Sequence, residues 1–167
     1  MADLKVYPDT VLRKKTVPVE TIDGHINRLI YEMAETMYMK RGIGLAAPQV
    51  GVSQKIVVVD IGEGLIPLIN PVIVEIDDEN ESFEEGCLSL PDIALKIDRS
   101  RKIVVKGINL DGNEIELEVS DLLARVFQHE VDHLEGTLII DRVSGVQKEL
   151  LKSKLKKLRK NAQNMDR

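Results

Sequence analysis

Residues 129–133 read His-Glu-Val-Asp-His, and this pentad constrains the fold because its two histidines meet only on a helix. Side chains four positions apart on a helix lie one turn above the other, with β-carbons ~5–6 Å apart. Both imidazoles can then bind one divalent metal ion, and Glu130 can reach a water molecule held by that ion and act as a general base. The alternative is that His25, His129 and His133, the three histidines of the chain, are ordinary surface or core residues.

The pentad closes a predicted helix that begins at Ser120 or Asp121, runs to about Leu134 and stops before Gly136. The apolar residues of this helix are Leu122, Leu123, Val126, Phe127, Val131 and Leu134. On the helix surface, the row of Leu122 and Val126 continues to His129 and His133, and the row of Leu123 and Phe127 continues to Glu130. The two histidines and the glutamate are therefore predicted to face inward. Burial raises the pKa of a carboxyl group, which suits a base that must accept and then release a proton.

Hydrophobic periodicity predicts the other elements. They are a helix at 21–40, strands at 55–60 and 65–76, a hairpin of 101–108 and 114–119 around Asp111-Gly112, and a basic amphipathic helix at about 145–162. Thr21 or Asp23 can cap the first helix. Pro67 and Pro71 make the second strand an irregular or edge strand, because proline cannot donate to a sheet.

With 167 residues, the chain has the length of one domain. Strands come in runs and the helices stand apart from them, which is typical of an α+β domain. We therefore predict one α+β domain over residues 1–167. It has a mostly antiparallel β-sheet around a central metal-binding helix, with an N-terminal helix and a C-terminal helix.

Composition excludes several classes of protein. The net charge of −5 gives no general case for nucleic-acid binding, so no DNA partner is predicted. The amino terminus lacks the apolar core of a signal peptide, and no apolar run approaches the ~20 residues of a membrane span. The single cysteine, Cys87, cannot form an internal disulfide, so a reducing cytoplasm is the natural setting.

Two histidines leave the site one ligand short, since a catalytic metal site normally has three protein ligands. The extended peptidase pattern H-E-x-x-H-x-x-G-x-x-H fails at its last position, which is Ile139. Glu149, the downstream glutamate of another peptidase arrangement, lies in the basic tail. His25 and Cys87 remain candidates for the third ligand. Cys87 is either a thiolate ligand for iron or zinc or a small buried hydrophobe.

Three segments resemble, in order along the chain, the motifs of the peptide deformylase family. The family patterns G-x-G-L-A-A-x-Q, E-G-C-L-S and H-E-x-D-H match residues 42–49, 85–89 and 129–133. Further similarity extends over nearly the whole chain, at residues 9–13, 35–38, 69–71 and 140–142. Three motifs in family order, in a domain of the right size, are highly specific.

The resemblance implies that Cys87, His129 and His133 bind the metal. The ion in this family is typically Fe²⁺, with Ni²⁺ or Co²⁺ as working substitutes and Zn²⁺ usually less active. Residue types alone indicate zinc, so the iron assignment depends on the resemblance.

The resemblance also implies a reaction. Deformylases remove the formyl group from the N-terminal formyl-methionine of new bacterial polypeptides, which gives formate and a free α-amine. A metal-bound hydroxide would attack the formyl carbon, with Glu130 as general base and acid. The side-chain amide of Gln49 and the backbone N–H of Leu88 would stabilise the charge on the formyl oxygen, where losing one donor costs ~10²–10³ in rate.

The slot for the methionine side chain is predicted to be apolar. Its expected residues are Ile43, Leu90, Val126 and Ile93. Gly44 would let a peptide backbone pass closely, or would form a tight turn packed on the sheet. Glu85 is expected to bind substrate near this slot, where it pairs with Arg99; a plain surface salt bridge is the alternative. Three departures from the common family pattern are expected to affect only pocket shape and peptide preference: Leu90, Asp98-Arg99-Ser100 and Arg125.

Two rival functions stay open from the residues alone. A zinc endopeptidase of the H-E-x-x-H type would need a third ligand that the downstream sequence does not supply. A non-catalytic metal-stabilised binding module would need a fourth ligand, from Asp132, Glu135 or His25.

The basic helix at about 145–162 has two interpretations. The favoured one is a C-terminal helix packed on the domain with a solvated outer face. A further hypothesis is that its basic face contacts ribosomal RNA near emerging chains.

Overall fold

The structure is a computed structural model that describes residues 2–165. Within this range it contains three α-helices, α1 (Gly24–Met39), α2 (Asp121–Leu134) and α3 (Gly145–Met165). The strands are β1 (Gly44–Ala46), β2 (Ile56–Val59), β3 (Ile66–Ile76), β4 (Asn80–Cys87), β5 (Leu90–Ser100), β6 (Lys102–Ile108) and β7 (Glu114–Ser120). Short 3-10 helices are η1 (Thr10–Arg13), η2 (Ala47–Val50) and η3 (Ile139–Asp141).

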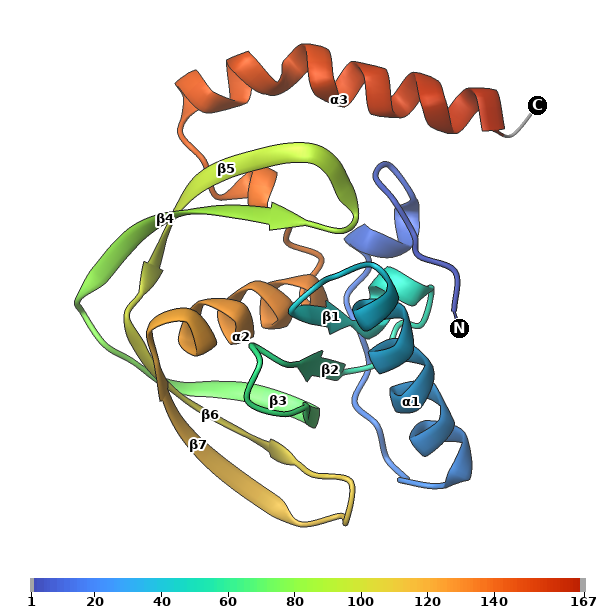
Figure 1. Ribbon diagram of the computed structural model, residues 1–167, viewed down its shortest axis with the longest axis vertical. Helices are drawn as coiled ribbons and strands as arrows, with labels where there is room; N and C mark the ends of the chain where they lie inside the picture. The colour runs from blue at the N-terminus through green and yellow to red at the C-terminus, as the bar shows by residue number, and fades with distance from the viewer. Residues whose placement is uncertain (1, 166–167) are drawn as a thin grey trace.

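The strands form two antiparallel sheets. One has five strands in the order β1-β2-β3-β6-β7, and β4 and β5 form a separate two-stranded sheet. Figure 1 shows α2 between the two sheets, and α2 contacts strands of both. The predicted α+β fold, with a central helix and helices near both ends, is confirmed.

The amphipathic sequence of α2 explains its central place. Phe127 is fully buried against the five-stranded sheet, and Glu130 and His133 point inward with exposed fractions of 4% and 1%. Leu122 was predicted to be part of the same inward rows, but it is 48% exposed. This residue lies in the first turn of the helix, where it forms part of the wall of a cleft described below.

α1 follows its predicted pattern. The Asp23 carboxylate caps its N-terminus by accepting a hydrogen bond from the Ile26 N–H at 3.1 Å. Its buried residues pack with those of β1 and β2 into one apolar cluster; from α1 these are Ile26, Leu29, Ile30, Met33 and Met37.

The proline-containing strand β3 is irregular, and the alternative that it is an edge strand is wrong. It lies between β2 and β6 in the sheet. Its register with β6 shifts twice, first between Ile69 and Val72. Pro67 precedes the pairing with β6 and Pro71 falls inside the first shift, so neither position has to donate a hydrogen bond to β6.

The hairpin of β6 and β7 forms as predicted. Gly112 in the connecting turn has φ of +82°, a left-handed conformation that favours glycine. β7 is the last strand of its sheet, and its outward side chains Glu114, Glu116 and Glu118 are exposed.

The hairpin of β4 and β5 was not predicted, yet it supplies a second wall around α2. In β5 the side chains alternate, with Ile93, Leu95 and Ile97 buried and Ala94, Lys96 and Asp98 exposed. The buried row joins an apolar cluster that includes Leu151 of α3.

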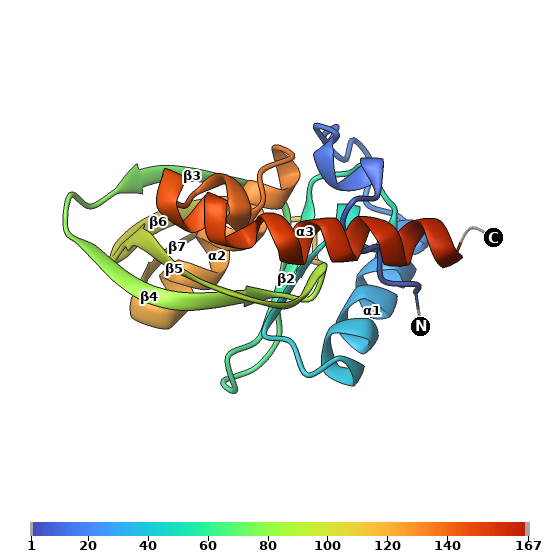
Figure 2. The ribbon, with the colours of Figure 1, turned by 90° about the horizontal axis from the view of Figure 1, so that it is seen from above.

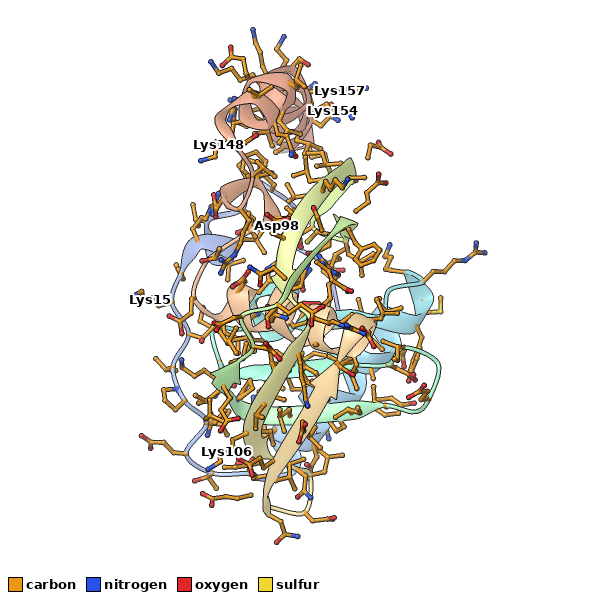
Figure 3. All side chains as sticks on the ribbon, turned by 90° about the vertical axis from the view of Figure 1, so that its left-hand side faces the viewer. Lys15, Asp98, Lys106, Lys148, Lys154 and Lys157 are labelled. Atoms are coloured by element: carbon orange, nitrogen blue, oxygen red, sulfur yellow. The ribbon has the colours of Figure 1, made fainter. Side chains whose placement is uncertain are left out.

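α3 lies across the outside of this hairpin (Figures 1 and 2). Leu151 is buried and Leu155 and Leu158 are partly buried, while Leu150 is 75% exposed. Arg159 Nη1 donates to the Tyr7 hydroxyl at 2.8 Å, which ties the helix to the N-terminal segment. Lysines of α3 stand out from its surface (Figure 3). The interpretation of a packed helix with a solvated outer face is confirmed.

Candidate metal centre

Cys87, His129 and His133 meet between the end of β4 and the last turns of α2. Their ligand atoms lie within 4.8 Å of one another, and Cys87 Sγ is 3.4 Å from His133 Nε2. The two imidazole centroids are 5.1 Å apart. Within residues 2–165, no other group of three His, Cys, Asp or Glu side chains comes this close together.

These residues fit a single transition-metal ion. A thiolate and two imidazoles give three ligands of the kind that bind iron or zinc, and they leave a position open. His129 Nδ1 is 2.9 Å from Glu85 Oε1, so its Nε2 is the ring nitrogen left for an ion. Glu130 Oε1 is buried without a hydrogen-bond partner among the described residues. This oxygen is therefore an unused hydrogen-bond acceptor beside the cluster.

The other ligand candidates lie elsewhere or are engaged. His25 is exposed on α1. Asp132 accepts hydrogen bonds from two arginines, and Glu135 and Glu149 pair with lysines. A closed site with four protein ligands is therefore not formed by the described residues.

Glu85 orients His129 from behind the metal centre. Its carboxylate binds Arg99 through Nε at 3.0 Å and Nη2 at 3.1 Å, and Arg125 through Nη1 at 2.5 Å. Burial opposes the charge of Glu85, but the hydrogen bonds from His129 and Arg99 outweigh it and lower the pKa to about 2. Glu85 is thus an anion that fixes the imidazole of His129.

This network corrects two expectations. The pair of Glu85 and Arg99 is buried, with exposed side-chain fractions of 5% and 4%, so the alternative of a surface salt bridge is wrong. Arg99 and Arg125 affect more than pocket shape, because both bind the carboxylate that orients His129. Glu85 does line the cleft, as expected of a residue near the substrate.

The titratable groups of α2 differ sharply in pKa. Burial raises the pKa of Glu130 to about 7; His129 opposes this shift, and Glu85 and Asp132 add to it. Burial lowers the pKa of His133 well below its usual value. Burial also opposes the charge of His129, but the neighbouring acidic groups, Glu130 first, raise its pKa.

Gln49 lies beside the metal centre and is 2% exposed. Its Oε1 accepts from the Ala46 N–H at 3.0 Å, and its Nε2 lies 3.8 Å from Cys87 Sγ and 3.1 Å from Ser89 Oγ. Leu88 follows Cys87 directly and lines the same cleft. Ser89 was not singled out from the sequence, although a lone hydroxyl between two leucines inside a motif was a usable signal.

A cleft of about 690 Å³ opens onto these groups. The apolar residues predicted for the methionine slot line it: Ile43, Leu90, Val126 and Ile93. Arg125, which was expected to affect the shape of the pocket, also lines it. Leu122 lines it too and was not predicted to do so.

Gly44 has a third reason to be glycine, besides the two that were expected. A β-carbon added there would lie 2.5 Å from Glu130 Oε2 and 2.8 Å from Val126 Cγ1. The carboxylate of Glu130 therefore occupies the space that any side chain at position 44 would need.

Comparison with known proteins identifies the family. A family model described as Polypeptide deformylase matches residues 1–149. The chain belongs to the peptide deformylase family. The peptide deformylase of Thermotoga sp. (strain RQ2) is 51% identical over 155 residues, which cover 93% of this chain and 94% of that protein.

Solved structures agree with this deformylase in fold. The crystal structure of the peptide deformylase from Thermotoga maritima has a TM-score of 0.85 and 52% identity, covering 86% of this chain and 98% of that one. The peptide deformylase from Legionella pneumophila has a TM-score of 0.89 and 39% identity, covering 97% of each chain.

This deformylase is an enzyme that removes the N-terminal formyl group from nascent polypeptides. The family assignment excludes the non-catalytic binding module and the zinc endopeptidase. None of the helices in the described part of the chain is long and apolar enough to cross a membrane.

Proposed function

We propose that deformylation takes place at one divalent metal ion bound by Cys87, His129 and His133, with Glu130 as general base and acid. The observation that carries this proposal is that three ligand atoms lie within 4.8 Å of one another, beside Glu130 Oε1, which has no hydrogen-bond partner in residues 2–165. When bound, such an ion activates water as a nucleophile and polarises the carbonyl group that it contacts.

Glu130 moves the proton. Its carboxylate accepts a proton from the attacking water at Oε1 and then donates it to the nitrogen of the departing peptide, which leaves as a neutral amine. A pKa of about 7 suits both halves of this transfer near neutral pH. A cation bound beside Glu130 favours its ionised form, which is the form that accepts the proton.

Two donors stabilise the charge that develops on the formyl oxygen. These are the Gln49 side-chain amide, through Nε2, and the backbone N–H of Leu88. The support is that Gln49 Nε2 lies 3.8 Å from Cys87 Sγ and that Leu88 is the next residue. Such donors lower the barrier because they are already oriented before the reaction begins.

The resident ion in this proposal is Fe²⁺, with Ni²⁺, Co²⁺ or Zn²⁺ as alternatives. The Cys87 thiolate suits iron or zinc, and the preference for iron comes from the family resemblance. A cysteine ligand must stay reduced, which supports a cytoplasmic location.

The methionine side chain of the substrate binds in the apolar part of the cleft. Ile43, Leu90 and Val126 supply its surface, and Gly44 leaves room for the peptide backbone. Glu85 is part of the cleft wall behind His129. It therefore affects substrate binding through the shape of the cleft.

The substrates are formylated nascent chains, and we propose that α3 contacts the ribosome that carries them. The support is its basic outer face, since α3 contains seven lysines and arginines and one acidic residue, Glu149. We also propose that residues 1–167 form one catalytic domain.

Formate release from formyl-Met-Ala-Ser tests the catalytic proposal, with protein purified without oxygen and reconstituted with Fe²⁺. Glu130→Gln is expected to lower kcat by ~10²–10⁴, because the proton transfer is lost. Glu135→Gln, an exposed position just after the same helix, is the matched control and should retain the wild-type rate. Normal formate release from a metal-loaded Glu130→Gln enzyme would exclude Glu130 as the base.

A further inference from the structure

The side-chain amide of Gln49 is held in one orientation by backbone groups. The Ala46 N–H donates to Oε1 at 3.0 Å, so this oxygen faces the backbone of the chain and Nε2 faces Cys87. A flipped amide would set Nε2 against the Ala46 N–H, and two donors would then face each other without an acceptor.

Ser89 completes this orientation from the other side. Its hydroxyl is fully buried, and Oγ lies 2.7 Å from the Lys5 carbonyl oxygen and 3.1 Å from Gln49 Nε2. A carbonyl oxygen only accepts, so the hydroxyl proton points to Lys5 and an Oγ lone pair faces Gln49. One N–H of the amide is therefore used by Ser89, and the second points to the metal centre, where Cys87 Sγ lies 3.8 Å from Nε2.

The N-terminal segment fixes the distance between Gln49 and Ser89. The Lys5 N–H donates to the Gln49 carbonyl oxygen at 2.7 Å, and the Tyr7 N–H donates to the Ser89 carbonyl oxygen at 2.9 Å. Gln49 and Ser89 are 40 residues apart in sequence, and residues 5–7 bind the backbone of both.

We propose that Ser89 is a positioning residue of the deformylation reaction. It holds the Gln49 amide so that the second Nε2–H points at the formyl oxygen of the substrate, and it acts only through Gln49. This inference rests on the proposed role of Gln49 as a donor to that oxygen.

The test is a double-mutant cycle of Ser89→Ala and Gln49→Leu, with kcat and KM for formyl-Met-Ala-Ser measured on Fe²⁺-loaded enzyme. Removal of one such donor costs ~10²–10³ in kcat, and we expect that range for Gln49→Leu. Ser89→Ala is expected to lower kcat by ~10–100-fold, with KM changed by less than about threefold, because the donor remains but is misaligned. In the Gln49→Leu background, Ser89→Ala should change kcat by less than about threefold, because it has no amide left to position.

Thr36→Val is the matched control. Thr36 is also fully buried, and its hydroxyl lies 3.0 Å from the Ala2 backbone nitrogen and 3.2 Å from the Ala2 carbonyl oxygen, away from Gln49. It should lower the thermal midpoint about as much as Ser89→Ala while kcat stays at the wild-type value. Metal content, measured by atomic spectroscopy, should be equal in all five proteins.

Three results would overturn the inference, and they differ in meaning. If Gln49→Leu loses activity but Ser89→Ala keeps the wild-type kcat, or the two losses multiply in the double variant, Ser89 does not act through Gln49. If Gln49→Leu itself keeps the wild-type kcat, the proposed role of Gln49 is wrong, and the role of Ser89 with it.

Discussion

Gly44 lies so close to Glu130 that even a methyl group would displace the carboxylate that we propose as the base. The added β-carbon of Gly44→Ala would be 2.5 Å from Glu130 Oε2, inside van der Waals contact. We expect kcat to fall by ~10–100-fold, because displacing a reacting group by about 1 Å can lower the rate by up to ~100-fold. The measurement is formate release from the metal-loaded variant.

Gly24→Ala is the matched control for this change. Gly24 is the first residue of α1, and nothing lies within 4 Å of an added β-carbon. It should retain the wild-type kcat. Wild-type activity in Gly44→Ala would mean that Glu130 can move without loss, which would contradict the proposed geometry.

The sequence predicts the residues of the metal centre better than the residues that support them. His129, Glu130 and His133 share one helix, so local spacing was enough, and Cys87 came from a motif. The support of His129 by Glu85, and the link from Ser89 to Gln49, join side chains 44 and 40 residues apart. Periodicity is a local property and carries no information about such pairs.

Among the elements, α3 is held to the domain by one narrow apolar stripe. Leu151 is 5% exposed and packs with residues of β5 and η3, so Leu151→Ala is expected to lower the free energy of unfolding by ~2–5 kcal/mol. Leu150→Ala, at a neighbouring position that is 75% exposed, should change it by less than about 0.5 kcal/mol. Urea unfolding followed by circular dichroism measures both, and equal midpoints for the two variants would contradict the observed packing.

The α-helices with clear patterns and the irregular strand β3 were predicted, but the β4–β5 hairpin was not. α1, α2 and the β6–β7 hairpin have clear periodicity and turn or cap residues. β4 is rich in acidic residues, with Glu81, Glu84 and Glu85 inside it, and Pro91 follows the first residue of β5, so neither strand has the usual composition. Alternation from Ile93 onward was nevertheless present, and it could have identified β5.

Over the whole molecule, charge is strongly separated. α3 carries seven basic residues and one acidic residue, a net charge of +6, so the rest of a chain with net −5 carries −11. An anionic partner such as ribosomal RNA would therefore be attracted to α3 and repelled by the remaining surface. The family match ends at residue 149, so most of α3 lies outside it.

Charge reversal on α3 tests the ribosome contact without disturbing the buried stripe. The variant changes three exposed lysines to glutamate: Lys148, Lys156 and Lys157. Its affinity for ribosomes is expected to fall by ~10–100-fold at low salt and to approach that of the parent at high salt, because the contact is electrostatic. Cosedimentation measures the affinity, and formate release from a free peptide should not change.

The matched control reverses three exposed lysines that lie outside α3: Lys14, Lys15 and Lys106. Figure 3 shows Lys15 and Lys106 far from the helix. Equal ribosome affinity of the two triple variants would contradict a specific role for α3.

The order of the sheet also affects how copies of the enzyme behave toward one another. An exposed edge strand offers unpaired backbone groups that can join the edge of another molecule and start an aggregate. Here one edge, β1, has only three residues, and the other, β7, alternates glutamates at 114, 116 and 118 along its outward side. Glu116 and Glu118 form ion pairs with Lys106 and Lys102 of β6, so β7 carries a row of charged groups along its outer face. These groups would lose water if another strand joined this edge, which opposes edge-to-edge aggregation of the enzyme.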